Sequence, residues 1–111
     1  LARRKLMSAE ELKDLPNGRL VRHCGIVTLR QQPGTASGVV FVSLEDETGV
    51  VQVIVWRRIR ERQRAVLAGS RLLAVRGVWQ RDGEATSLIA GHLEDLTPLL
   101  NGLSTVSRDF H

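Results

Sequence analysis

The sequence predicts a mainly β domain, a five-stranded barrel with one helix between its third and fourth strands. Five apolar runs follow one another, and two of their connections are short glycine-containing turns, at residues 46–49 and 81–84. One charged, helix-prone stretch, residues 57–68, interrupts the series after the third run. With 111 residues, 42% of them hydrophobic and 25% charged, the chain can bury one core and fold as one domain.

A short helix is expected ahead of the barrel, within residues 1–19. Ser8 and Glu11 have the spacing of a capping box, in which each residue bonds the other's backbone N–H group. The Pro-Asn-Gly run at residues 16–18 ends a helix. This segment is therefore expected to be a helical lead-in.

The barrel is expected in residues 20–95, and residues 96–111 form a C-terminal tail. Its strands are expected at residues 20–29, 39–45, 50–56, 71–80 and 85–93. Gly25 indicates a bulge or a sharp bend in the first strand, and Gly49 suits the positive φ of a hairpin turn. This order of elements is that of the OB-fold, a partly open Greek-key barrel that binds oligonucleotides on its second and third strands.

One amide, Gln52, lies alone among apolar residues in the third expected strand. Because strand side chains alternate between two faces, an outward Gln52 places Ile54 beside it and sends the intervening valines into the barrel. The inward set is then Val40, Val42, Leu44, Val51, Val53 and Val55. Phe41 falls in the outer set, where a base could stack on its ring and bond to the Gln52 amide. The pattern leaves open an alternative in which Phe41 enters the core and Gln52 is only solvated.

Basic residues are expected around this surface. The formal net charge of +4 favours a polyanionic partner. Arg30 and Arg81 flank the expected groove, and Arg57 directly follows Trp56. Arginines of this kind contact phosphates and give affinity without sequence choice. Trp56 either extends the stacking surface or covers the end of the barrel.

No catalytic site, metal site or cofactor is predicted. The acidic run at residues 45–47 is consecutive in a turn, where its side chains diverge, and the three histidines lack metal-ligand spacing. His23 and Cys24 are neighbours in a strand and point to opposite faces, which disfavours a nucleophile–base pair. One cysteine, no signal-peptide pattern and no apolar run of membrane length favour a cytoplasmic protein that meets no membrane.

The segment GVVFVSLEDETGVVQVIVW, residues 38–56, resembles the second and third strands of the anticodon-binding OB domains of class II aminoacyl-tRNA synthetases. The resemblance extends over roughly residues 20–80. It implies that the positions of Phe41 and Gln52 contact a base and that Arg30 lies close to bound RNA. Ile54 stands where that family often has a second aromatic residue, so stacking there is expected to be weaker.

Another resemblance covers nearly the whole chain. The runs RQQPGTASGVVFVSLEDETG, RLLAVRGVWQRDG, DLTPLL and SRDFH resemble the end of the error-prone, DnaE-like translesion DNA polymerases of the bacterial C family. The resemblance implies that Leu1 is a cut site within a long polymerase, that His111 is its C-terminus and that the catalytic residues lie upstream. This fragment would then be no enzyme, but a domain that holds single-stranded template DNA during damage-induced (SOS) mutagenesis and DNA repair.

The same resemblance implies protein partners, an inactive Y-family-like polymerase and, through it, the sliding clamp. The tail has two interpretations: its leucines, at near-helical spacing, pack on the barrel, or SRDFH is offered to a partner with Leu99, Leu103 and Phe110 as contacts. The competing function is therefore a docking module that recruits the polymerase to its mutasome partners. RNA binding, as in the synthetases, is a third alternative, against which the SRDFH ending argues.

Overall fold

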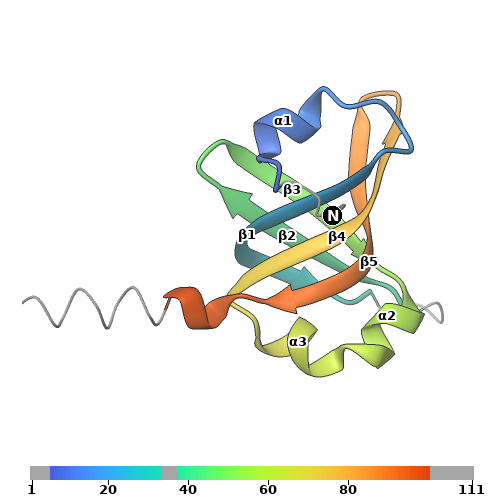
Figure 1. Cartoon of the computed structure of the whole chain (residues 1–111). Helices are drawn as coiled ribbons and strands as arrows, with labels where there is room; N and C mark the ends of the chain where they lie inside the picture. Colours follow the sequence, from blue (N-terminus) through green and yellow to red (C-terminus); the bar gives the residue numbers. More distant parts are fainter. Residues whose placement is uncertain (1–5, 34–37, 101–111) are drawn as a thin grey trace, which may run out of the picture.

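Five strands with alternating apolar residues close into a barrel in the computed structural model, which describes residues 6–33 and 38–100 (Figure 1). The strands are β1 (Leu20–Gln31), β2 (Val40–Asp46), β3 (Gly49–Val55), β4 (Leu72–Asp82) and β5 (Ala85–Asp95). Their order round the barrel is β1-β2-β3-β5-β4, and β4 pairs with β1 to close it. Neighbouring strands are antiparallel except β3 and β5, which are parallel. The predicted OB-fold is confirmed.

The barrel interior is filled by the alternating residues of every strand. Val42, Leu44, Val53 and Val55 have no exposed surface. Full burial of such side chains stabilises the fold by roughly 1.5–3 kcal/mol each. The inward set expected from the sequence is therefore the observed core of β2 and β3.

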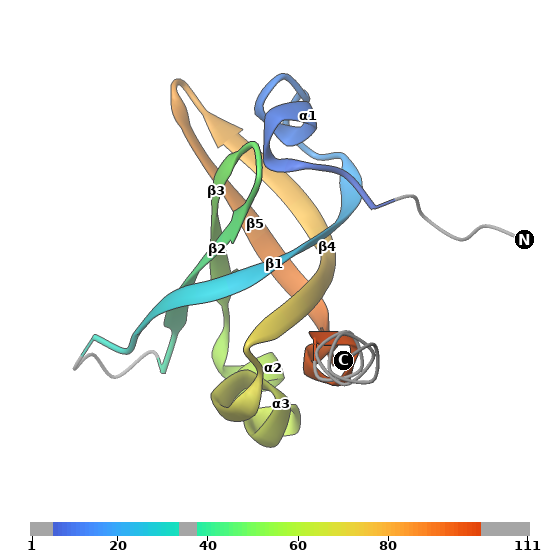
Figure 2. The same ribbon diagram turned by 90° about the vertical axis from the view of Figure 1, so that its left-hand side faces the viewer.

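Helix α1 (Ala9–Lys13) lies over one end of the barrel, beside the β2–β3 turn (Figure 2). The predicted capping box is present: Ser8 Oγ accepts from the Glu11 N–H, and the Glu11 carboxylate accepts from the Ser8 N–H. Asp46 ties the helix to the turn, because one carboxylate oxygen accepts from the Ala9 N–H at 2.9 Å. Leu12 is fully buried beneath the helix.

Two short helices, α2 (Arg57–Arg62) and α3 (Arg64–Gly69), close the opposite end. The sequence predicted one helix over residues 57–68, and the break at Gln63 corrects it. The Gln63 amide donates to the Leu93 carbonyl at 2.7 Å and accepts from the Leu93 N–H at 2.8 Å. Because β3 pairs with β5 only near Leu88 and Ile89, Gln63 supplies the partner that this edge of β5 lacks. That inward bond interrupts the helix.

The bulge that was one of the two expectations for Gly25 is not there, and the sharp bend stays a prediction. The register of β1 against β2 shifts between Val27 and Leu29. A Cβ atom at Gly25 would lie 3.0 Å from the Glu45 carbonyl oxygen, so glycine is needed there because β2 approaches closely. The positive φ expected at Gly49 is confirmed, at 159°. In the part of the chain described, no helix has the length and apolar character to cross a membrane.

Candidate nucleic-acid interface

The outer face of β2 and β3 brings together the residues singled out in the hairpin. Phe41 pairs with Ile54, and Ser43 pairs with Gln52. Gln52 is exposed, while Phe41 and Ile54 are half-buried on the same outer face. The structure thus excludes the alternative in which Phe41 belongs to the barrel core.

A hydrogen bond fixes the Gln52 amide on this face. The Ser43 hydroxyl donates to Gln52 Oε1 at 3.1 Å, and Ser43 is 8% exposed. Because Ser43 takes only one lone pair of the carbonyl oxygen, the NH₂ group of Gln52 keeps both of its N–H donors for a ligand. The site therefore presents two N–H donors beside the Phe41 ring, suited to an acceptor on a base or a sugar.

Aromatic residues for stacking are few. Trp56 is 50% exposed and lies where β3 ends and α2 begins. Trp79 is 3% exposed and points into the barrel. Phe110 lies outside the described residues. Within the described ranges, Phe41 and Trp56 are consequently the aromatic side chains that a base could reach.

A row of outward apolar residues continues from this face round the barrel. The sequence analysis did not identify this row. Strand pairing continues from Ile54 to Ile89, from Ile89 to Val78, and from Val78 to Leu20. Val78 is 39% exposed and Leu20 is 53% exposed. In the sequence, the only indication of this row is one outward apolar residue in each of three further strands, Leu20, Val78 and Ile89. Only the strand register shows that these residues are neighbours.

Arg30, expected to flank this face, has its side chain engaged on α3. It pairs with the inward-facing Val42, and its guanidinium group donates to the carbonyls of Leu67, at 2.7 Å, and Ser70. The last carbonyls of a helix have no partner within the helix. Arg30 therefore caps the C-terminal end of α3.

Arg81 is engaged in the same way at the opposite end of the barrel. Its guanidinium group donates to the carbonyls of Leu15, at 2.9 Å, and Lys13. Lys13 is the last residue of α1 and Leu15 follows shortly after it, so Arg81 holds the end of the helix rather than standing free beside the groove. Arg57 does remain at the surface, in a pair with Glu61 at 3.1 Å whose side chains are 65% and 51% exposed. Such a pair is worth roughly 0–1 kcal/mol, so a phosphate can compete for Arg57.

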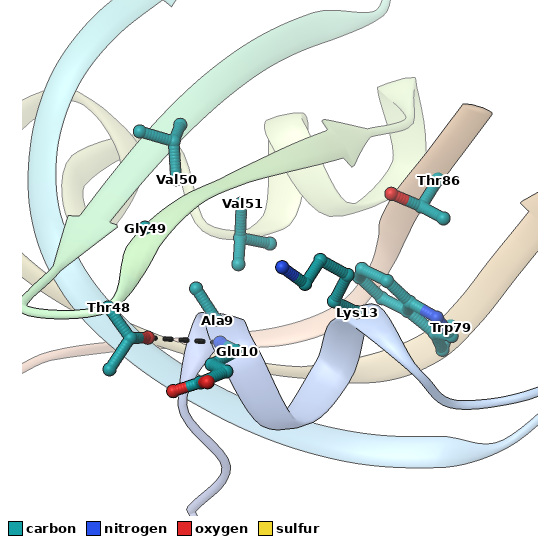
Figure 3. Close-up of a pocket in the computed structure, with 9 residues that line it drawn as sticks. All are labelled: Ala9, Glu10, Lys13, Thr48, Gly49, Val50, Val51, Trp79 and Thr86. Atoms are coloured by element: carbon teal, nitrogen blue, oxygen red, sulfur yellow. Dashed lines mark hydrogen bonds between the residues drawn. The ribbon is translucent and has the colours of Figure 1, made fainter. Parts of the chain in front are cut away.

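A separate hollow of about 190 Å³ lies between α1 and the β2–β3 turn (Figure 3). The Lys13 side chain extends toward Val51 and the ring of Trp79, and Thr48 Oγ1 accepts from the Glu10 N–H at 2.9 Å. Both charges of the hollow, Lys13 and Glu10, come from α1. The contacts round it are those that dock the helix on the barrel.

The acidic turn has a structural role. One oxygen of Asp46 accepts from the Thr48 N–H, the Thr48 hydroxyl and the Gly49 N–H at 2.8–3.0 Å. Burial raises the pKa of Asp46, but the hydrogen bonds from Ala9, Thr48 and Gly49 outweigh it and lower that pKa below its usual value. Among residues 6–33 and 38–100, no group of His, Cys, Asp or Glu could hold a metal ion.

His23 and Cys24 lie on opposite faces of β1, as expected. His23 is fully buried, and its Nδ1 lies 2.8 Å from the Met7 carbonyl oxygen. Cys24 is half-buried on the other face, and desolvation by burial raises the pKa of its thiol. This arrangement provides no activated thiolate.

The tail contacts can be followed only in part. Leu99 is 58% exposed, whereas Leu96 and Leu100 are half-buried. Leu103 and Phe110 lie outside the described residues, so their expected contacts stay predictions.

Comparison with known proteins agrees with the fold. Residues 9–96 match the family model of the OB-fold nucleic acid binding domain. The chain is 59% identical over 111 residues to an error-prone DNA polymerase of Pseudomonas fluorescens, covering 100% of this chain and 11% of the relative. It is 59% identical over 108 residues to an error-prone DNA polymerase of Burkholderia mallei, covering 97% and 10%. The chain thus spans about a tenth of these relatives.

Solved structures share the fold at low sequence identity. Asparaginyl-tRNA synthetase from Pyrococcus horikoshii matches with a TM-score of 0.68 and 22% identity, over 82% of this chain and 23% of that one. The hypothetical protein ygiW from E. coli matches with a TM-score of 0.63 and 11% identity, over 83% and 90%. With the closed barrel and the family model covering most of the chain, these findings place it plainly: it belongs to the family of OB-fold nucleic acid binding domains.

Proposed function

We propose that this domain binds single-stranded template DNA for an error-prone translesion DNA polymerase, on the outer face of β2 and β3. The observation that carries the proposal is the pairing of Phe41 with Ile54 beside Ser43 and Gln52, with the ring and the amide both facing outward. A base stacks on Phe41, which contributes roughly 1–3 kcal/mol. The Gln52 NH₂ group donates to that base or its sugar.

Trp56 and Arg57 continue the same surface at the end of β3. The half-exposed indole offers a second stacking position, and the Arg57 guanidinium group exchanges Glu61 for a phosphate. Stacking accepts every base, and phosphate contacts carry no sequence information. The proposed binding is therefore tolerant of sequence, which suits a polymerase that copies damaged template.

The polymerase context is supported by relatives at 59% identity that are named error-prone DNA polymerases. Since the chain spans about a tenth of them, the catalytic residues belong to the rest of such a protein, and this domain holds template beside them. We place it in the bacterial cytoplasm, in damage-induced mutagenesis.

Fluorescence anisotropy of a labelled single-stranded DNA oligomer, titrated at several salt concentrations, tests the proposal. Phe41→Ala should weaken binding about 5- to 150-fold, corresponding to ~1–3 kcal/mol of lost stacking. Val50→Ala is the matched control, because Val50 is 54% exposed on the same face of β3 without neighbouring Phe41. An RNA oligomer of equal sequence tests the synthetase-like alternative. Absence of binding at low salt would refute the proposal.

A second candidate function is supported by the apolar row. Leu20 and Val78 expose apolar surface on the barrel, and Leu99 does so in the tail. A docking module for the inactive Y-family-like polymerase, and through it the sliding clamp, would use such a surface. Val78→Lys should then abolish binding of that partner in titration calorimetry while DNA binding persists. A variant that still binds the partner would exclude this use of the row.

A further inference from the structure

A groove of about 390 Å³ is lined by residues from the end of β1, the start of β2 and the helices α2 and α3. Arg30, Arg60 and Arg64 line it, together with the amides of Gln31 and Gln32. Its apolar floor includes Val40 and Leu67. No carboxylate is among its lining residues, so the charged groups of the groove are all positive.

The three positive charges of this arginine groove are not neutralised by ion pairs among the described residues. Arg30 bonds to the carbonyls of Leu67 and Ser70, and Arg60 bonds to the Gly38 carbonyl at 3.4 Å. Carbonyl partners are neutral and leave the full charge of each guanidinium group in place. The two ion pairs found in the described ranges, Arg22 with Glu94 and Arg57 with Glu61, involve none of the three.

The carbonyl bonds also fix the direction of Arg30. A guanidinium group has five N–H donors in a planar fork, and Arg30 uses its Nε and one Nη group on α3. Its remaining donors have no partner within residues 6–33 and 38–100. A preorganised guanidinium fork matches the oxygens of a phosphate in two parallel hydrogen bonds. An oxyanion with more than one acceptor oxygen is therefore the ligand class that this groove fits.

The groove adjoins the stacking face directly. Gln31, on its wall, pairs with Phe41 across β1 and β2, and Val40, on its floor, precedes Phe41 in β2. A single strand whose base lies on the Phe41 ring therefore has its neighbouring backbone within reach of the arginines.

We propose that the arginine groove binds backbone phosphates of the single strand whose base stacks on Phe41. This inference rests on the proposed function, and it makes α2 and α3 part of the interface. Phosphates in the groove would give the strand a defined path, from the β2–β3 face toward the helices. The interface thereby gains the positive charge of three arginines, Arg30, Arg60 and Arg64.

Two double substitutions with equal loss of charge test the groove in the 111-residue chain. Arg60→Gln with Arg64→Gln removes two groove arginines, whereas Arg58→Gln with Arg62→Gln removes two exposed arginines of α2 that do not line it. Binding of the labelled oligomer is measured against salt concentration. The groove variant should bind on the order of tenfold more weakly, and its log K against log salt should be flatter by about 1.4, or 0.7 per lost phosphate contact. The control variant should stay near the wild type.

The outcomes separate the groove from the stacking face. Equal losses in the two double variants would overturn the groove, because the arginines would then act only as distant charge. If the groove variant loses affinity for the oligomer while Phe41→Ala binds as tightly as the wild type, the result would support the groove and refute the stacking proposal. A wild-type chain that binds no oligomer would overturn both. Melting temperatures of both double variants within a few degrees of the wild type would show that their folding is intact.

An oligomer with one uncharged methylphosphonate linkage, moved stepwise along the strand, gives an independent readout. The wild type should lose affinity when the neutral linkage reaches the groove, and the groove variant should show no such position. Equal sensitivity of both proteins at every position would contradict the proposed path.

Discussion

Gly77→Ala should be among the most damaging single substitutions in this chain. A Cβ atom at Gly77 would lie 1.9 Å from the Ile89 carbonyl oxygen, 2.9 Å from the Ile89 carbonyl carbon and 3.1 Å from the Gly91 nitrogen. All three are backbone atoms of β5, so no flexible side chain can move aside. The β4–β5 register shifts between Arg76 and Gly77, and the close approach occurs at this irregularity.

The size of the effect follows from what must move. Extra methyl groups in a packed interior cost typically about 1–3 kcal/mol, and displacement of a paired backbone lies at or above the upper end of that range. We expect a loss of about 3 kcal/mol, which for a domain of this size lowers the melting temperature by roughly 12–24 °C. Circular dichroism with thermal and urea unfolding measures both quantities.

Gly69→Ala is the matched control for this prediction. Gly69 ends α3, and no atom lies within 4 Å of the position of its Cβ. The substitution should be neutral or should stabilise the fold by about 0.4–1 kcal/mol, because alanine reduces the freedom of the unfolded chain. If Gly77→Ala unfolds within about 1 kcal/mol of Gly69→Ala, the close approach of β5 does not determine the choice of glycine.

The remaining predictions concern side chains that join distant elements. Asp46→Asn should make the stability of the fold less sensitive to acid. Because the pKa of Asp46 is lowered in the folded state, its carboxylate stabilises the fold above the unfolded pKa of about 4, and this stabilisation is lost as pH falls through the folded pKa. In urea unfolding from neutral to acidic pH, the wild type should therefore lose more stability than the variant. Gln63→Ala removes both hydrogen bonds to Leu93 and should cost about 2–3 kcal/mol, and a melting temperature unchanged from wild type would contradict that role. Arg81→Ala should lower stability by about 1–2 kcal/mol without changing the salt dependence of DNA binding, and a flatter salt dependence would show that Arg81 contacts phosphate after all.

Most of the fold could be predicted because its signals are local. The alternation in β2 and β3 gave the inward set correctly, and all six of its side chains are buried, although Ser43 of the outward set is buried as well. The break between α2 and α3 could not be predicted in this way. The break depends on the hydrogen bonds between Gln63 and Leu93, which are 30 residues apart. Helix propensity over residues 57–68 gives no information about a partner that distant.

In the candidate site, too, the features that depend on local sequence could be predicted and those that depend on distant contacts could not. Strand period puts Gln52 and Ile54 on one face but leaves open whether Phe41 faces outward, and the structure places the three together. The contacts of Arg30 and Arg81 could not be predicted, because charge in a loop predicts exposure and says nothing of unpaired carbonyls elsewhere. Arg30 reaches α3 across 37 residues, and Arg81 reaches the end of α1 across 66.

The small number of contacts predicts weak intrinsic binding. Among the described residues, Phe41 and Trp56 are the reachable aromatic side chains, and the net charge of the chain is only +4. Largely electrostatic binding of this kind has a Kd on the order of 10⁻⁴–10⁻⁶ M at physiological salt. Tethering beside a polymerase active site supplies effective concentrations in the millimolar range, so such an affinity is sufficient to hold template. Anisotropy at about 0.15 M salt measures this Kd. A nanomolar value would contradict the reasoning and require contacts beyond this face and the arginine groove.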